Sequence, residues 1–106
     1  MLTQAEAMQR VTTMQAQLQA KGLDGALFIF PIDVYYFSGT RQNSTLWIPA
    51  VGEPVLMVRK SLSRAKAESV LTNIRPFPSS KEFPALIGDQ VRKIGFRDIE
   101  ITKLPF

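Results

Sequence analysis

Two residue types that carry much of protein chemistry, cysteine and histidine, are missing from this 106-residue sequence. Without cysteine the chain can form neither a disulfide nor a thiolate site. Without histidine it lacks the commonest zinc ligand and the base that activates the nucleophile in Ser-His-Asp and Cys-His catalysis. We therefore predict no catalytic residue and no metal ligand in this chain.

Long hydrophobic runs and export signals are also absent. The longest apolar run spans residues 26–32, whereas a membrane-spanning helix needs about 20 residues. Residues 1–6 have neither the basic start nor the apolar core of an export signal. The sequence therefore predicts no membrane partner and a cytoplasmic location.

Phosphate-binding glycine loops and clusters of acidic residues do not occur either. The six glycines form no GxGxxG or Walker pattern, and the carboxylates lack the spacing of metal ligands. The net charge of +4 is compatible with a nucleic-acid partner. The basic residues are scattered, however, with Arg59–Lys60 and Arg92–Lys93 as the adjacent pairs, so we expect no nucleic-acid binding.

The sequence does contain enough apolar residues for a globular domain. Hydrophobic residues make up 45% of the chain, and its length suits a single core, so we expect one domain over residues 1–106. Thr3 and Glu6 have the spacing of a capping box that opens a helix, and Gly22 fits its stop position. The apolar stripe of this helix consists of Met8, Val11, Met14 and Leu18. Core packing explains the two methionines better than a soft-metal pair or an oxidation sensor does.

Apolar runs and turn residues alternate through the rest of the chain. The unbroken run 26–30 predicts a strand buried on both faces, and Asp33 predicts the cap of a helical turn that Gly39 ends. Residues 45–48 and 55–58, joined by a short turn, predict an antiparallel hairpin. Trp47 lies within this hairpin, where a core or interface position is expected.

The C-terminal half repeats the alternation of helices and strands. Ser61 predicts the cap of a helix that runs to about residue 71 and turns Leu62, Ala65 and Val70 inward. Residues 74–77 predict a short strand, and Pro76 indicates either an edge position or the end of the strand. A third helix is expected after Ser79 or Ser80, with an apolar stripe of Phe83, Leu86, Ile87 and Val91. The strand expected at 94–96 is extended or followed by residues 99–101. This order predicts an α/β domain with a mixed sheet flanked by helices.

One polar loop stands out as a candidate binding site. Residues 35–44 join an aromatic turn to a loop that holds Arg41 and follows the carboxyl end of a central strand, where ligands of open α/β sheets gather. Arg41 could form a bidentate contact with a carboxylate. In the alternative, purely structural interpretation, Tyr35 and Phe37 pack under the sheet while Arg41 and Gln42 are solvated.

Several segments together resemble the N-terminal domain of the creatinase, prolidase and aminopeptidase P family. They are the "GLDGAL" entry at 22–27, the "YYFSG" turn at 35–39, the "GEP" hairpin at 52–54 and the "KIGF" strand at 93–96. The resemblance implies a ribonuclease H-like α/β domain and covers nearly the whole chain up to about Phe96. Asp33 departs from the Asn of many relatives, and residues 97–106 match the usual continuation poorly. The chain also stops before the last helix and strand expected of this domain, so we expect either a piece of a longer chain or a natural remnant.

The resemblance also implies a function. In this family a separate C-terminal "pita-bread" domain, absent here, binds two divalent metals, typically Mn, Co or Zn, and cleaves bonds before proline. The N-terminal domain builds a homodimer and shapes the rim of the site that receives the peptide substrate. The resemblance implies that Tyr36, Arg41 and Gln42 bind substrate across the dimer and that this chain alone is inactive. The alternative is a stand-alone module that holds a small carboxylate ligand or a protein partner.

Overall fold

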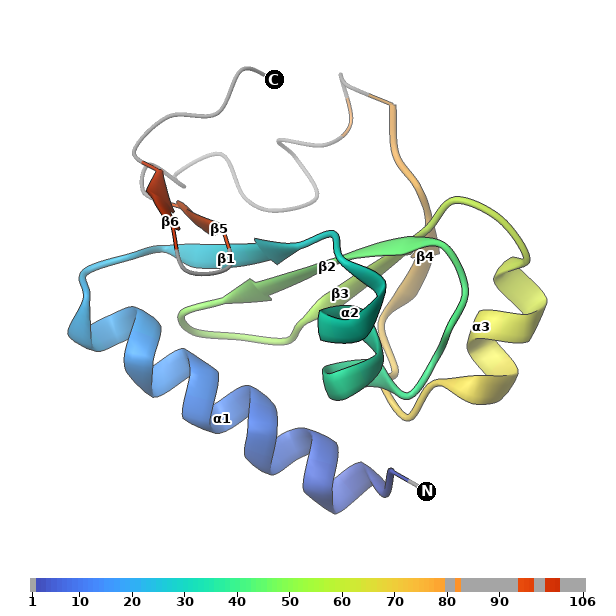
Figure 1. Ribbon diagram of the computed structural model, residues 1–106, viewed down its shortest axis with the longest axis horizontal. Coiled ribbons are helices and arrows are strands. Elements are labelled where there is room, and N and C mark those ends of the chain that lie inside the picture. The colour runs from blue at the N-terminus through green and yellow to red at the C-terminus, as the bar shows by residue number, and fades with distance from the viewer. Residues whose placement is uncertain (1, 80–81, 83–93, 97–98, 102–106) are drawn as a thin grey trace.

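In the computed structural model, which describes residues 2–79, 82, 94–96 and 99–101, six strands form one mixed sheet (Figure 1). The helices described are α1 (Gln4–Ala20), α2 (Pro31–Ser38) and α3 (Leu62–Glu68). The strands are β1 (Gly25–Phe28), β2 (Ser44–Pro49), β3 (Val55–Val58), β4 (Ile74–Pro76), β5 (Ile94–Phe96) and β6 (Ile99–Ile101). Helix α1 packs on β1 and β2, α2 packs on β2 and on α1, and α3 contacts β4. The predicted α/β fold with a mixed sheet is confirmed.

The strand order is β4-β3-β2-β1-β5-β6. The β1–β2, β2–β3 and β5–β6 pairs are antiparallel, while β1–β5 and β3–β4 are parallel. This confirms the hairpin predicted for β2 and β3, and it places the proline-containing strand β4 at an edge, as expected. Trp47 of β2 is only 2% exposed, which confirms its predicted core position.

Both ends of α1 follow from local sequence. The Thr3 hydroxyl oxygen accepts the Glu6 N–H over 3.2 Å, and a Glu6 carboxylate oxygen accepts the Thr3 N–H over 3.2 Å, so the predicted capping box is present. At the other end, the Leu23 N–H donates to the Leu18 carbonyl over 2.9 Å, past Gly22 in the left-handed conformation. The helix thus begins and ends where these residues predict.

The apolar stripe of α1 is predicted correctly except at Met8. Val11 and Leu18 are buried and Met14 packs against the core, but Met8 is 56% exposed. Ala7, at 1% exposure, occupies the position expected for Met8. Neighbouring residues on a helix differ by about 100° in direction, so an inward Ala7 turns Met8 outward.

The boundary between β1 and α2 lies earlier than predicted. All four residues of β1 are buried, but Ile29 and Phe30 are exposed. Pro31 is the first residue of α2 and Phe30 is the N-cap, without a side-chain hydrogen bond. The predicted cap at Asp33 is therefore wrong, because proline prefers the first helical position and restricts the residue before it to an extended conformation.

Helix α3 is shorter than predicted and lacks the expected cap. Ser61 precedes it in a left-handed conformation, with φ of 62°, and its side chain makes no capping hydrogen bond. The helix ends at Glu68, so Val70 lies beyond it, although Ala65 is fully buried as predicted. Ser79 and Glu82 form the expected capping contacts, but the third predicted helix lies outside the described residues.

Candidate functional site

The candidate loop, residues 39–43, leaves α2 through a fixed set of hydrogen bonds. Gly39 ends the helix as predicted, with φ of 82° and an N–H that donates to the Tyr35 carbonyl over 2.9 Å. The buried Ser38 hydroxyl donates to the Val34 carbonyl over 2.6 Å and accepts the Thr40 N–H over 3.3 Å. The first residues of the loop are therefore anchored to the body of α2.

Glu68, the last residue of α3, holds the loop from the other side. Its carboxylate accepts the hydroxyl of Thr40 at 2.7 Å, the side-chain amide of Gln42 at 3.2 Å and, more weakly, the Arg41 N–H at 3.4 Å. Thr40 is fully buried. Two of the predicted site residues, Arg41 and Gln42, thus meet at one carboxylate, which fixes the path of the backbone between them.

These contacts favour the ionised form of Glu68. The hydrogen bond from Thr40 is the main cause that lowers its pKa below the ordinary value of 4.5, and the one from Gln42 is the second. Burial opposes these two hydrogen bonds and raises the pKa of Glu68, while the Arg41 N–H and the charge of Arg64 lower it by smaller amounts. The loop and the charge of Glu68 therefore stabilise each other.

We expect the loop to loosen when Glu68 is protonated. Because its pKa is lowered in the fold, its contribution to stability is complete above the unfolded value of 4.5 and is lost as pH falls through the lower native value. In an acid titration followed by NMR, the amide signals of residues 40–42 should move in one transition below pH 4.5. Glu68→Gln should abolish this transition, whereas Glu6→Gln, at the start of α1, should leave it in place. Equal titration of the loop in the Glu68→Gln variant would contradict this role.

The Arg41 side chain lies beside the ring of Tyr35 in α2. Its guanidinium lies 5.2 Å from the centre of the exposed Tyr35 ring, and it forms no ion pair within the part of the chain that the structure describes. The structural interpretation expected both Tyr35 and Phe37 to pack under the sheet. Phe37 is buried, as expected, but Tyr35 is exposed. Arg41 of the loop and Tyr35 of α2 thus form an exposed arginine–tyrosine pair.

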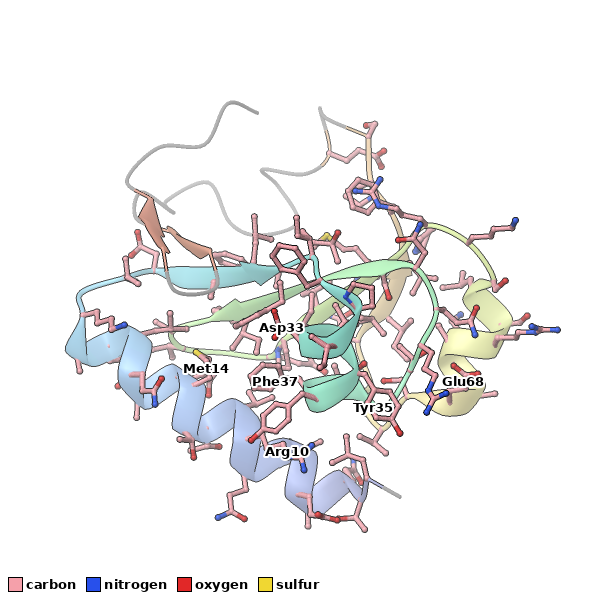
Figure 2. The ribbon with its side chains drawn as sticks, viewed as in Figure 1. Arg10, Met14, Asp33, Tyr35, Phe37 and Glu68 are labelled. Carbon is pink, nitrogen blue, oxygen red and sulfur yellow. The ribbon has the colours of Figure 1, made fainter. Side chains whose placement is uncertain are left out.

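Tyr36, the third predicted residue, contacts a different helix. The Arg10 guanidinium of α1 lies 4.1 Å from the centre of the Tyr36 ring, and its Nη1 donates to the Tyr36 carbonyl. Figure 2 shows Arg10 and Met14 beside Phe37 between α1 and α2, whereas Tyr35 lies on the side of α2 that faces Glu68. The structure thus brings Arg41 and Gln42 together at α3 and directs Tyr36 to α1.

A groove of about 380 Å³ lies where Tyr36 meets α1, and we call it the α1–α2 groove. Its lining residues come from both helices: Glu6, Gln9, Arg10, Thr13, Met14, Gln17, Tyr36 and Phe37. Neither Arg10 nor Glu68 was identified from the sequence. Both act on residues 26 positions away along the chain, a separation at which helical and strand periodicity carries no signal.

The surface around α2 is unusually apolar for an exposed helix. Five large side chains within residues 29–36 are between 41% and 70% exposed: Ile29, Phe30, Ile32, Tyr35 and Tyr36. We call this set the α2 face; within it Tyr36 lies toward α1 and Tyr35 toward Glu68 of α3. Exposed apolar side chains are common singly, so it is their concentration on one short segment that distinguishes these five.

The described residues offer no metal site, since they contain no group of three or more acidic side chains that could hold an ion. Among them, no helix is long and apolar enough to cross a membrane.

Comparison with known proteins identifies the domain type. Residues 10–102 match the family model of the creatinase/prolidase N-terminal domain, whereas no curated protein matches the sequence. A proline dipeptidase from Streptococcus agalactiae is similar in structure, with a TM-score of 0.71 at 20% identity over 86% of this chain and 76% of that chain. The creatinase/prolidase N-terminal domain of an X-Pro dipeptidase from Streptococcus pyogenes gives 0.69 at 18% identity over 84% and 76%.

A dipeptidase from Mycobacterium ulcerans, PepE, gives a TM-score of 0.68 at 19% identity and covers 81% of this chain. The chain spans only 26% of that dipeptidase. At these identities the structural likeness establishes the fold alone.

Proposed function

The chain belongs to the family of creatinase/prolidase N-terminal domains, and we propose that it serves as the non-catalytic N-terminal domain of a Xaa-Pro dipeptidase or aminopeptidase P. In this role it would form a homodimer and shape the rim of the substrate site. Catalysis would belong to a separate domain with two divalent metals, Mn, Co or Zn. The chain by itself would then hydrolyse no peptide, in keeping with its lack of histidine.

The observation that carries this proposal is the α2 face. Helix α2 is mostly apolar and short, yet much of its apolar surface is exposed rather than turned to the sheet. Tyrosine and arginine are the residue types most often found at the energetic centre of protein interfaces. The α2 face supplies Tyr35 and Tyr36, each stacked with an arginine. These features support a surface that is covered in the working assembly.

The loop that follows α2 is the part that would shape the substrate site. It starts from the same helix as the α2 face, so a partner bound to that face would lie next to Arg41 and Gln42. Glu68 holds the Arg41 backbone and the Gln42 side chain in place, while the Arg41 guanidinium is exposed and free of ion pairs within the described residues. Such an arginine suits the carboxylate of a peptide. Tyr36 turns toward α1, so it would contribute to the substrate site from another side of α2.

Dimerisation is tested by sedimentation velocity over a range of concentrations. We expect the chain to form dimers as its concentration rises, and Ile32→Glu, at a position 70% exposed on the α2 face, to keep it monomeric. The matched control is Val51→Glu, because Val51 is 81% exposed but lies in the β2–β3 turn. Dimers that survive Ile32→Glu would overturn the assignment of this face, and a chain that is monomeric throughout would overturn self-association.

A further inference from the structure

The α1–α2 groove combines a cationic side chain with an aromatic wall. Its volume of about 380 Å³ lies within the range of small-molecule pockets, about 300–1,000 Å³. Among the residues that line it, Arg10 is the cation, and the apolar ones are Met14, Tyr36 and Phe37. The groove is therefore large enough for a small ligand with both a charged and an apolar part.

Arg10 is held in an orientation that leaves donors available. The guanidinium lies over the Tyr36 ring, with 4.1 Å between Cζ and the ring centre, and Nη1 donates one hydrogen bond to the Tyr36 carbonyl. A guanidinium has five N–H donors, so this contact uses a minority of them. Arg10 is half-buried and forms no ion pair with the residues that the structure describes. A planar, partly desolvated and preoriented guanidinium suits the two oxygens of a carboxylate.

The wall beside Arg10 suits an apolar or aromatic group. The Phe37 ring stands edge-on to Tyr36, with 5.0 Å between ring centres, and Phe28 supports it from the core at the same distance. Met14 is half-buried and adds a polarisable thioether, which makes favourable contacts with aromatic rings. This side of the groove is thus rigid, because Phe37 is 4% exposed and cannot turn away.

Glu6 sets the charge that a ligand can carry. It also lines the groove, but its Oε1 is engaged by the Thr3 N–H and hydroxyl at 3.2 and 3.0 Å. This engagement draws the carboxylate toward the start of α1, and its negative charge would repel a ligand with two anionic groups. From these observations we propose that the α1–α2 groove binds a small monocarboxylate with an aromatic or aliphatic body, anchored by Arg10.

This inference needs neither a dimer nor a catalytic domain, although the groove shares Tyr36 with the α2 face. It also differs from the interpretation of the sequence, which assigned a carboxylate to Arg41. Arg41 and Tyr35 form the same kind of stacked pair as Arg10 and Tyr36 but do not line the groove. They therefore provide a matched control for the charge and for the stacking.

A titration of the 106-residue chain with 3-phenylpropionate, followed by NMR, tests the proposal. We expect saturable shifts at the Arg10 Nε–H and at the amides of residues 36 and 37, with a Kd on the order of a millimolar. The uncharged amide 3-phenylpropanamide should bind about tenfold more weakly, since it lacks the charge-assisted hydrogen bonds. A second groove of about 360 Å³ has Glu53 as its charged lining residue and should show no shifts.

Three variants separate the site from general effects of charge. Arg10→Gln should weaken the binding of 3-phenylpropionate about tenfold, whereas Arg41→Gln should leave it unchanged. Glu6→Gln keeps a capping-box residue and removes the like charge, so it should tighten binding. Equal affinity for the acid and its amide, or no saturable shift at Arg10 in the folded wild-type chain, would overturn the proposal. Equal losses in the two arginine variants would do the same.

Discussion

Replacing Phe28 by alanine is expected to lower the free energy of unfolding by about 3–5 kcal/mol. Phe28 is 5% exposed, and it lies at the end of β1, which pairs with β2 on one side and β5 on the other. Its ring contacts that of Phe37, with 5.0 Å between centres, so the substitution removes packing between the sheet and α2. Domains of this kind have total stabilities of about 5–15 kcal/mol, so the variant will be marginally folded. Denaturation in urea, monitored by the fluorescence of Trp47, measures the loss.

Phe30→Ala is the matched control for this prediction. It removes the same side chain two residues further along, but Phe30 is 41% exposed and its side chain makes no capping hydrogen bond at the start of α2. The loss should be clearly smaller than for Phe28→Ala, because less packing is removed and water can fill the space. Similar losses in both variants would mean that β1 does not carry the core contacts assigned to it.

The elements that sequence predicts well are those with a local physical cause. The Thr3–Glu6 capping box spans one helical turn, and Gly39 ends α2 through its own backbone conformation. The β2–β3 hairpin follows from a link too short to cross the sheet. In each case the interacting groups are close in sequence, so the residue types alone determine the structure.

The errors occur where two local signals compete. Asp33 and Pro31 both favour a helix start, and the proline determines the boundary because its ring fixes φ. Ser61 is a favoured cap residue, yet the chain turns there in a left-handed conformation and its hydroxyl makes no capping bond. Burial in the folded chain decided between Ala7 and Met8, and residue type alone does not encode which of the two turns inward.

Part of the candidate site could also be predicted from the sequence, and part could not. The loop at 39–43 could be located from the sequence, because a polar stretch after a buried strand indicates the ligand-binding edge of a sheet. Its supports could not, since Glu68 and Arg10 come from helices distant in sequence. Only the packing of α3 beside the loop and of α1 beside α2 brings these charges to their partners.

Gly25→Ala is expected to destabilise the domain by about 1–3 kcal/mol or more, although it adds a single methyl group. A Cβ at this position would overlap Cη2 of Trp47, lie 2.5 Å from its Cζ2 and lie 2.9 Å from the Ile48 carbonyl oxygen. Trp47 is 2% exposed and lies on β2, the strand paired with β1, so its indole can make room only by displacing its buried neighbours. Strand β1 therefore requires glycine at position 25, because the Trp47 side chain of β2 approaches its backbone closely.

A double-mutant cycle with Trp47→Leu tests this cause. Removing the indole should itself destabilise the domain, but it should reduce the further cost of Gly25→Ala, because two of the three close contacts disappear. The contact with the Ile48 carbonyl remains, so part of the cost should persist. Gly22→Ala is the control, since no atom lies within 4 Å of its Cβ position and its cost comes from a φ of 69°. That cost should be additive with Trp47→Leu, whereas additivity at Gly25 would exclude the indole as the reason for glycine there.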